Sequence, residues 1–187
     1  MNDPYEWRCV SSTNEASQRR LDKAFEGAVN GSGLLCFSRS WNNILMWSHY
    51  ADRHSGICLG FDVPDKFANN VVYLGDLRVI GDLEGLSTVE VRKVHDQQYH
   101  FKYVDWSYEE EVRIHSKPDT VEGGNHFTKF GEDLQLKEVI AGARFSEGKA
   151  VIEDALKGYS REVAISKPAR STTKFEIVRD EHGFDVR

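Results

Sequence analysis

Residues 36–62 read CFSRSWNNILMWSHYADRHSGICLGFD, and this stretch predicts a strand, a short helix and a second strand. The strands, Leu34–Ser38 and Gly56–Asp62, are short apolar runs rich in β-favouring residues. Between them, apolar side chains recur at near-helical spacing over Asn43–Ala51, and an asparagine at position 42 or 43 can cap the first helical turn. Two tryptophans, a tyrosine and two histidines fall within the stretch, which is the first indication of a functional site.

These aromatic and imidazole side chains allow two interpretations. The rings of Trp47 and Tyr50 offer flat apolar faces on which a ligand can stack, and His49 and His54 offer hydrogen-bonding groups that titrate near neutral pH. Alternatively, Trp47 and Tyr50 belong to the hydrophobic core, and His49 is a partly buried, hydrogen-bonded histidine.

Composition places the chain among globular proteins. With 187 residues, 40% hydrophobic and 29% charged, it is long enough to bury a core and forms a single domain spanning 1–187. The net charge of −6 and the absence of a basic face disfavour broad binding to nucleic acid. No basic leader with an apolar run and no membrane-spanning run is visible. Two of the three cysteines, Cys36 and Cys58, are expected to be buried free thiols, which fits a reducing cytoplasm.

The element order predicts an α+β fold, with a mixed or mostly antiparallel sheet and short flanking helices. A capping box of Ser12 and Glu15 is expected to open a helix whose inner stripe holds Leu21, Ala24, Phe25 and Ala28. Two further helices are expected at Thr88–Val104 and at Glu147–Gly158, the latter with Val151, Ile152, Ala155 and Leu156 inward. The further expected strands are Val71–Ile80 with a break at Gly75, Glu109–His115, His126–Phe130, Leu136–Ala143, Glu162–Ser166 and Phe175–Val178.

The strongest chemical cluster is Glu109, Glu111 and Arg113. On a strand these side chains share one face, with the two carboxylates roughly 7 Å apart. Arg113 can fix the rotamer of Glu111 and keep it ionised, and a fixed carboxylate can act as a base or stabilise an oxocarbenium-like centre. The alternative is an exposed, salt-bridged strand face without catalytic function.

Other chemistries lack their usual patterns. His49 and His54 are five residues apart, which is not the spacing of a helical zinc pair, so no metal is expected. The strand cysteines are in apolar surroundings that do not activate a thiol. Neither a nucleophile elbow, nor a Walker loop, nor a dinucleotide-binding glycine motif is present.

Several pieces in order resemble a bacterial family labelled domain of unknown function 2971, and the resemblance runs from residue 2 to about 158. The pieces are Asn2-Asp3-Pro4-Tyr5-Glu6, Cys36-Phe37-Ser38, Leu45-Met46-Trp47-Ser48-His49-Tyr50-Ala51 with Gly56-Ile57-Cys58-Leu59-Gly60-Phe61, Lys102 followed by Trp106-Ser-Tyr-Glu109-x-Glu111-x-Arg113, and Ile140-Ala-Gly142.

The layout of this family also resembles that of compact ADP-ribosyltransferases. That fold-level analogy implies NAD as the substrate and a strand glutamate as the catalytic residue. It places Glu111, or Glu109, in the catalytic position, supported by Arg113 and His49. The analogy also places Ser38 on the second cleft strand and Trp47 or Tyr50 beside nicotinamide, and Trp106 is added to the candidate cofactor-binding residues.

One departure from the family is expected to matter. The Asn-Asp-Pro-aromatic piece normally follows an N-terminal strand and helix, whereas the present sequence opens at that piece, so two alternatives are expected: the true start lies upstream, or the protein is a trimmed and inactive version. A missing strand exposes a sheet edge through which chains can associate. Three functions follow as hypotheses: an NAD-using ADP-ribosyltransferase-like enzyme in toxin or phage defence, a non-catalytic module that binds a nucleotide or a protein, and a hydrolase or nuclease using His49 with the carboxylates.

Overall fold

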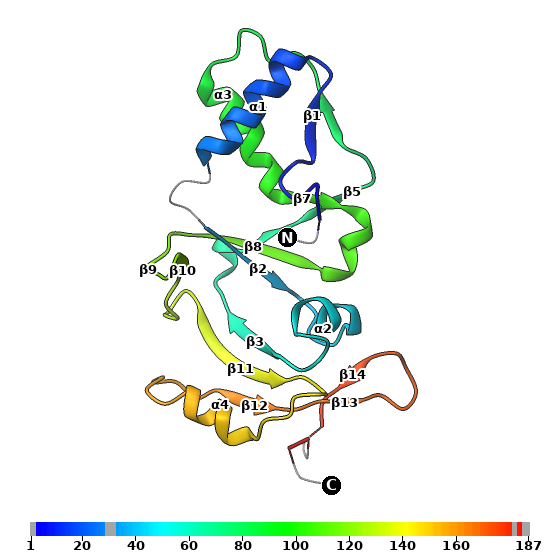
Figure 1. The fold of residues 1–187 in the computed structure, drawn as a ribbon, viewed down its shortest axis with the longest axis vertical. Coiled ribbons are helices and arrows are strands. Elements are labelled where there is room, and N and C mark those ends of the chain that lie inside the picture. The colour runs from blue at the N-terminus through cyan, green and yellow to red at the C-terminus, as the bar shows by residue number, and fades with distance from the viewer. Residues whose placement is uncertain (1–2, 29–32, 181–182, 185–187) are drawn as a thin grey trace. The chain divides into compact units, whose positions relative to one another are not determined.

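The chain folds as two units, each assembled from two separate stretches of sequence. In this computed structural model, which describes residues 3–28, 33–180 and 183–184, the first unit comprises residues 1–39 and 66–128 and the second comprises 40–65 and 129–187. Figure 1 traces both units from the N-terminus to the C-terminus. Each unit is described by itself.

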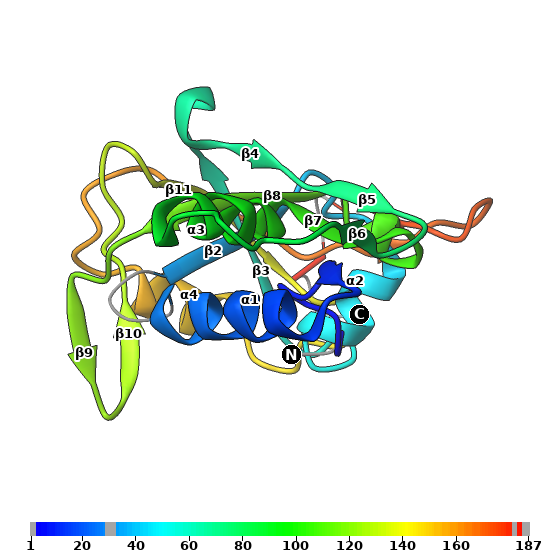
Figure 2. The same ribbon diagram turned by 90° about the horizontal axis from the view of Figure 1, so that it is seen from above.

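In the first unit, two helices pack together beside a small parallel sheet. The strand β1 (Val10–Ser12) pairs in parallel with β6 (Arg78–Ile80). Leu21 of α1 (Glu15–Ala28) lies in an apolar cluster with Leu83 and with Val91 of α3 (Thr88–Asp96), and both figures of the fold show these helices side by side (Figures 1 and 2).

The starts of these helices follow from local side-chain hydrogen bonds. The Asn14 side chain accepts a hydrogen bond from the Ser17 amide at 3.0 Å, so Asn14 fulfils the capping role expected of Ser12. At α3, Ser87 and Glu90 form a reciprocal capping box.

A second group of strands in this unit carries the candidate site. The strand β8 (Glu111–Ser116) lies between β2 (Gly33–Ser38) and β4 (Asn69–Asn70), and both pairings are antiparallel. The strand β5 (Val72–Leu74) pairs in parallel with β7 (Phe101–Tyr103). The remaining elements are the hairpin of β9 (Thr120–Glu122) and β10 (Asn125–Phe127), seen in Figure 2, and the 3-10 turns η1 (Asp65–Phe67), η2 (Gln97–His100) and η3 (Val104–Glu109).

The second unit is built around β11 (Gln135–Ala141). This strand pairs antiparallel with β3 (Ile57–Asp62) and parallel with β12 (Ala164–Ser166). Its buried residues Leu136, Val139 and Ala141 pack with Ile152 of α4 (Lys149–Ala155). The other elements are α2 (Ile44–Tyr50), β13 (Ala169–Arg170) and β14 (Ile177–Val178), of which the last two pair antiparallel.

The predicted α+β class with mixed strand pairing is confirmed, as are the helix capped by Asn43 and the strands on either side of it. The strand predicted over Val71–Ile80 is also present, as β5 and β6 with the break at Gly75. Of the inner stripe predicted for α1, Leu21 and Ala24 pack against the core, whereas the side chains at positions 25 and 28 lie outside the described residues.

Other predictions were wrong at particular residues. The helix expected over Thr88–Val104 ends at Asp96, because the chain continues through the 3-10 turn η2 into β7. In α4, Val151 and Ala155 are exposed, since the helix places only Ile152 and Leu156 against β11. Cys36 is exposed and not buried, whereas Cys58 is half-buried. In the described ranges, no helix is both long and apolar enough to cross a membrane.

Candidate functional site

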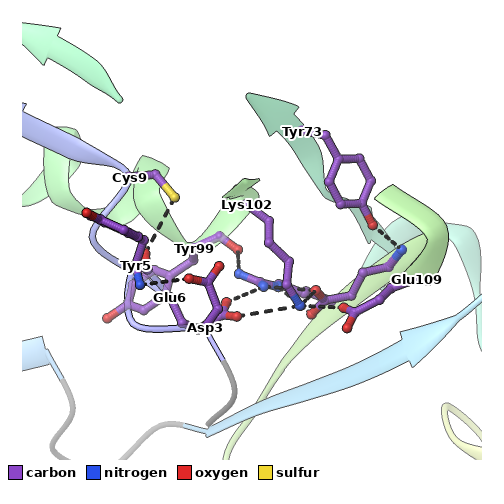
Figure 3. A network of polar contacts seen from close by, with 10 residues as sticks. Asp3, Tyr5, Glu6, Cys9, Tyr73, Tyr99, Lys102 and Glu109 are labelled. Carbon is purple, nitrogen blue, oxygen red and sulfur yellow. Dashed lines mark hydrogen bonds and ion pairs between the residues drawn. The ribbon is translucent and has the colours of Figure 1, made fainter. Parts of the chain in front are cut away.

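The site centres on a buried cluster of three carboxylates and two cations in the first unit (Figure 3). Arg113 of β8 donates from Nε to Oε1 of Glu111 at 2.7 Å and from Nη2 to Oε2 at 3.0 Å. Lys102 of β7 donates to Glu111 at 3.0 Å and also pairs with Glu109. Glu6 pairs with Arg113 and lies 3.5 Å from Lys102. The charges thus form one connected network, which we call the Glu111–Arg113 cluster.

Glu110, which lies between Glu109 and Glu111, has a left-handed backbone conformation. Glu109 ends the 3-10 turn η3, and Glu110 has a φ of 45°, so the strand begins only at Glu111. The prediction that strand alternation places Glu109 beside Glu111 was therefore wrong in its geometry. The two carboxylates nevertheless meet, because both bind Lys102, which lies on β7 in a different sheet.

Backbone and aromatic groups fix the cluster further. Nη1 of Arg113 donates to the carbonyl oxygen of Tyr99 at 2.8 Å. The hydroxyl of Tyr73 accepts a hydrogen bond from the Glu111 amide at 2.8 Å, which anchors the start of β8. Arg113 thus donates hydrogen bonds from all three nitrogens of its planar guanidinium. A lysine at this position cannot reproduce that geometry.

Burial strengthens these ion pairs and also raises the energetic cost of losing any one partner. Glu111 is 6% exposed, Arg113 is 1% exposed, and Lys102 and Glu109 are buried as well. Three carboxylates face two cations, which leaves one negative charge in excess. Buried charges that lose their partners are costly, so each member of the cluster depends on the others.

The electrostatic surroundings keep Glu111 and Lys102 ionised. Burial acts to raise the pKa of Glu111, but hydrogen bonds and charge from Arg113 and Lys102 outweigh it and lower this pKa below its ordinary value. For Lys102, burial acts to lower the pKa of the ammonium group, but the carboxylates of Glu109 and Glu111 outweigh this effect and raise that pKa. At neutral pH both groups carry full charge.

Two further predicted residues of the first unit lie beside the cluster. Ser38 at the end of β2 stands opposite Glu111 in the antiparallel register. The ring of Trp106 lies 5.4 Å from the Lys102 ammonium group, within the range of a cation–π contact. The structure thus brings together Glu109, Glu111, Arg113, Ser38 and Trp106 from the predicted set.

The other predicted residues belong to the second unit, on α2. Trp47 is 2% exposed and donates from Nε1 to the Trp41 carbonyl oxygen at 2.6 Å, so it is a core residue of that unit. Tyr50, 55% exposed, and His49 present their side chains at the surface, with ring centroids 6.3 Å apart in an edge-on contact.

Sequence reasoning missed several members of the cluster. Lys102 was assigned to a helix, and Glu6 and Tyr73 were given no chemical role. For Glu6 and Lys102 a signal was present, because both lie in the pieces that resemble the family. Only the fold could identify Tyr73, since its contribution is a hydrogen bond across 38 positions of sequence.

A strained turn follows α2. Asp52, Arg53 and His54 have φ values of 41°, 54° and 74°, three consecutive non-glycine residues in the left-handed region. Each such residue costs about 1–2 kcal/mol. Backbone hydrogen bonds from His54 to Trp47 (3.2 Å) and from Ser55 to Asp52 (3.0 Å) hold this conformation. Strain of this kind is concentrated at functional sites.

Metal and thiol chemistry find little support in the described part of the chain. Within those residues, no group of three or more His, Cys, Asp or Glu side chains is arranged to hold a metal ion. Burial, together with the charge of Asp3, raises the pKa of Cys9 to about 11, so its thiol stays protonated at neutral pH.

Fold and site together define an α+β protein with a buried ion-pair cluster in one unit and an exposed aromatic helix in the other. A family model described as protein of unknown function (DUF2971) matches residues 46–114. This match confirms the predicted resemblance to that family over α2, β3 and the chain as far as Ile114, and it includes Lys102, Glu109, Glu111 and Arg113. Comparisons with curated proteins and with solved structures gave no match.

Proposed function

We propose that this protein binds a nucleotide-like molecule on α2 without catalysing a reaction of that ligand, and that the Glu111–Arg113 cluster stabilises the fold. The observation that carries the proposal is the state of Glu111. Its two oxygens accept three hydrogen bonds from Arg113 and Lys102, and the residue is 6% exposed. These bonds occupy three of the roughly four acceptor positions of the carboxylate, so a substrate hydroxyl would compete with two cations for Glu111.

The exposed face of α2 offers the chemistry that a nucleotide needs. Tyr50 presents an aromatic face on which a base or a nicotinamide ring can stack, and His49 presents an imidazole edge for hydrogen bonds. Arg53 follows in the strained turn with its side chain 83% exposed; it lies 3.8 Å from the exposed carboxylate of Asp52, a weak surface pair that a phosphate group can replace. An exposed aromatic ring and an exposed guanidinium three positions apart in the chain suit a flat, anionic ligand.

Thermal unfolding with and without excess NAD tests this proposal. A ligand that binds only the folded state at 100 times its Kd adds about 2.7 kcal/mol, which raises Tm by roughly 5–11 °C for a chain of this size. The variant Tyr50→Ala should keep its own Tm, because the side chain is exposed, yet lose the shift. Tyr103→Ala, at an exposed tyrosine of the first unit, is the matched control and should retain the shift. The absence of a shift in the unmodified chain would refute NAD as the ligand.

The second candidate is an ADP-ribosyltransferase-like enzyme that consumes NAD, in toxin or phage-defence biology. The arrangement that favours it is the register of Ser38 opposite Glu111, with Glu109 joined to Glu111 through Lys102. In this function Glu111 would stabilise the oxocarbenium-like ribose while nicotinamide leaves.

Release of nicotinamide from NAD distinguishes the two functions. The enzyme requires that Glu111→Gln lose turnover by at least about 10²-fold while remaining folded. The binding module requires that no turnover occur and that the same variant lose stability. Turnover in the unmodified chain would therefore overturn the non-catalytic assignment.

A further inference from the structure

Two side chains of the second unit form a nucleophile–base pair that the proposed function does not use. Oγ of Ser48, on α2, lies 3.2 Å from Nε2 of His54. Ser48 is exposed and His54 is half-buried, so a reactant can approach the hydroxyl from solvent. A serine hydroxyl within hydrogen-bonding reach of an imidazole is the basic arrangement of nucleophilic catalysis.

The serine hydroxyl has two acceptors within reach. The same Oγ lies 3.0 Å from the carbonyl oxygen of Ile44, one helical turn earlier. Because a hydroxyl carries one hydrogen and rotates about its C–O bond, it can donate to the Ile44 carbonyl or to His54 without movement of any heavy atom. Rotation toward His54 therefore prepares the oxygen for attack.

The backbone holds the imidazole in place. The His54 amide donates to the Trp47 carbonyl at 3.2 Å, and the His54 carbonyl accepts from the Arg144 amide at 3.0 Å. The imidazole ring stacks over Trp47 with an interplanar angle of 11° and a centroid separation of 6.4 Å. Gly142 lies so close that a Cβ there would be 2.0 Å from the His54 carbonyl oxygen. The base is therefore fixed by backbone bonds, a ring contact and close packing.

The local charge suits acyl transfer. Burial and the positive charge of Arg144 lower the pKa of His54, so the imidazole is neutral and able to accept a proton at neutral pH. Ile44, 37% exposed and one turn from Ser48, offers apolar surface for an acyl group.

We propose that Ser48 and His54 form a catalytic dyad that hydrolyses activated carboxylic esters. Oγ of Ser48 bonds to the ester carbonyl carbon while His54 Nε2 takes its proton. The bond to the leaving oxygen then breaks, and His54 returns the proton to the departing alcohol. Water next attacks the acyl-serine and gives its proton to His54, which passes it to Ser48 as the acid is released. This activity is independent of nucleotide binding on Tyr50.

A fluorophosphonate probe tests the nucleophile directly, because the serine oxygen displaces fluoride from phosphorus and keeps the phosphonyl group. Intact-mass measurement and peptide mapping on the full chain should locate one adduct at Ser48, and the chain should release p-nitrophenol from p-nitrophenyl acetate. Ser48→Ala should abolish both signals. Ser146→Ala, at an exposed serine of the same unit, should retain them and shows that exposure alone is not sufficient.

The base is tested with His54→Asn, because asparagine tolerates the left-handed backbone that His54 adopts. This variant should be labelled at least about 10²-fold more slowly, since general-base catalysis contributes that much or more. Circular dichroism confirms that each variant is folded. Absence of an adduct at Ser48 in the unmodified chain, or equal labelling rates with and without His54, would overturn the dyad.

Discussion

Replacing Arg113 by glutamine should destabilise the protein far more than replacing its partner Glu111 by glutamine. Arg113 donates to Glu111 twice, to Glu6 and to the Tyr99 carbonyl, and it is 1% exposed. Its loss leaves the buried carboxylates of Glu109 and Glu111 and the half-buried carboxylate of Glu6 with Lys102 as the cation that remains in the cluster. Breaking a buried pair in this way costs about 3–5 kcal/mol.

Glu111→Gln has a smaller expected cost because it balances the charges. Two carboxylates, Glu6 and Glu109, then face the two cations Lys102 and Arg113. What is lost is the charge that strengthens the hydrogen bonds to Glu111, and such bonds contribute about 1.5–3 kcal/mol each. Removal of the excess negative charge offsets part of that loss, so we expect about 2 kcal/mol.

Urea unfolding followed by far-UV circular dichroism measures the difference. With an m-value of about 2 kcal/mol/M, Arg113→Gln should lower the midpoint by roughly 1.5–2.5 M and Glu111→Gln by about 1 M. Arg19→Gln removes the exposed pair with Glu15 and should change the free energy of unfolding by less than about 1 kcal/mol. If Arg113→Gln is no more destabilising than Arg19→Gln, the reasoning about the buried cluster is wrong.

Three other predictions concern pH, packing and capping. The pKa of Glu111 is lower in the folded than in the unfolded protein, so its contribution to stability is complete above the unfolded pKa of about 4.3 and is lost as the pH falls through the folded pKa. Urea titrations from pH 6 to 3 should therefore show that the free energy of unfolding falls more steeply in the unmodified chain than in Glu111→Gln. Gly142→Ala should cost about 1–3 kcal/mol in calorimetry, because its Cβ would meet the His54 carbonyl, whereas Gly131→Ala, with nothing within 4 Å, should change stability by less than about 0.5 kcal/mol. Asn43→Ala should cost about 1 kcal/mol, since the side chain accepts from the Leu45 amide at 2.9 Å, and replacement by serine should restore most of the loss.

The sequence correctly predicted the helix and the two strands in and around residues 36–62. Short apolar runs of β-favouring residues identified β2 and β3, and Asn43 identified the start of α2, because such runs and caps are local features of the chain. The same rules failed after Asp96, where residues with a helical apolar pattern form a 3-10 turn and then β7. That change depends on pairing with β5, which lies more than twenty residues earlier.

The sequence identified Glu109, Glu111 and Arg113 as members of the candidate site, but it predicted neither their remaining partners nor their burial. Glu109, Glu111 and Arg113 were expected to form an exposed strand face if they had no catalytic role, yet all three are buried. Their burial depends on Lys102 and Glu6, which come from β7 and from the N-terminal segment. No local pattern reveals such partners, because an ion pair between distant elements leaves no periodic trace in the sequence.

Hydrogen–deuterium exchange with and without saturating NAD tests the central claim most directly. The proposed binding on α2 predicts slower exchange in peptides that cover residues 44–54, and unchanged exchange in peptides that cover residues 102–113. Tyr50→Ala should remove the protection, and Tyr103→Ala should preserve it. Protection of residues 102–113 instead would show that the ligand engages the Glu111–Arg113 cluster and would contradict its purely structural role, and protection of neither segment would contradict nucleotide binding itself.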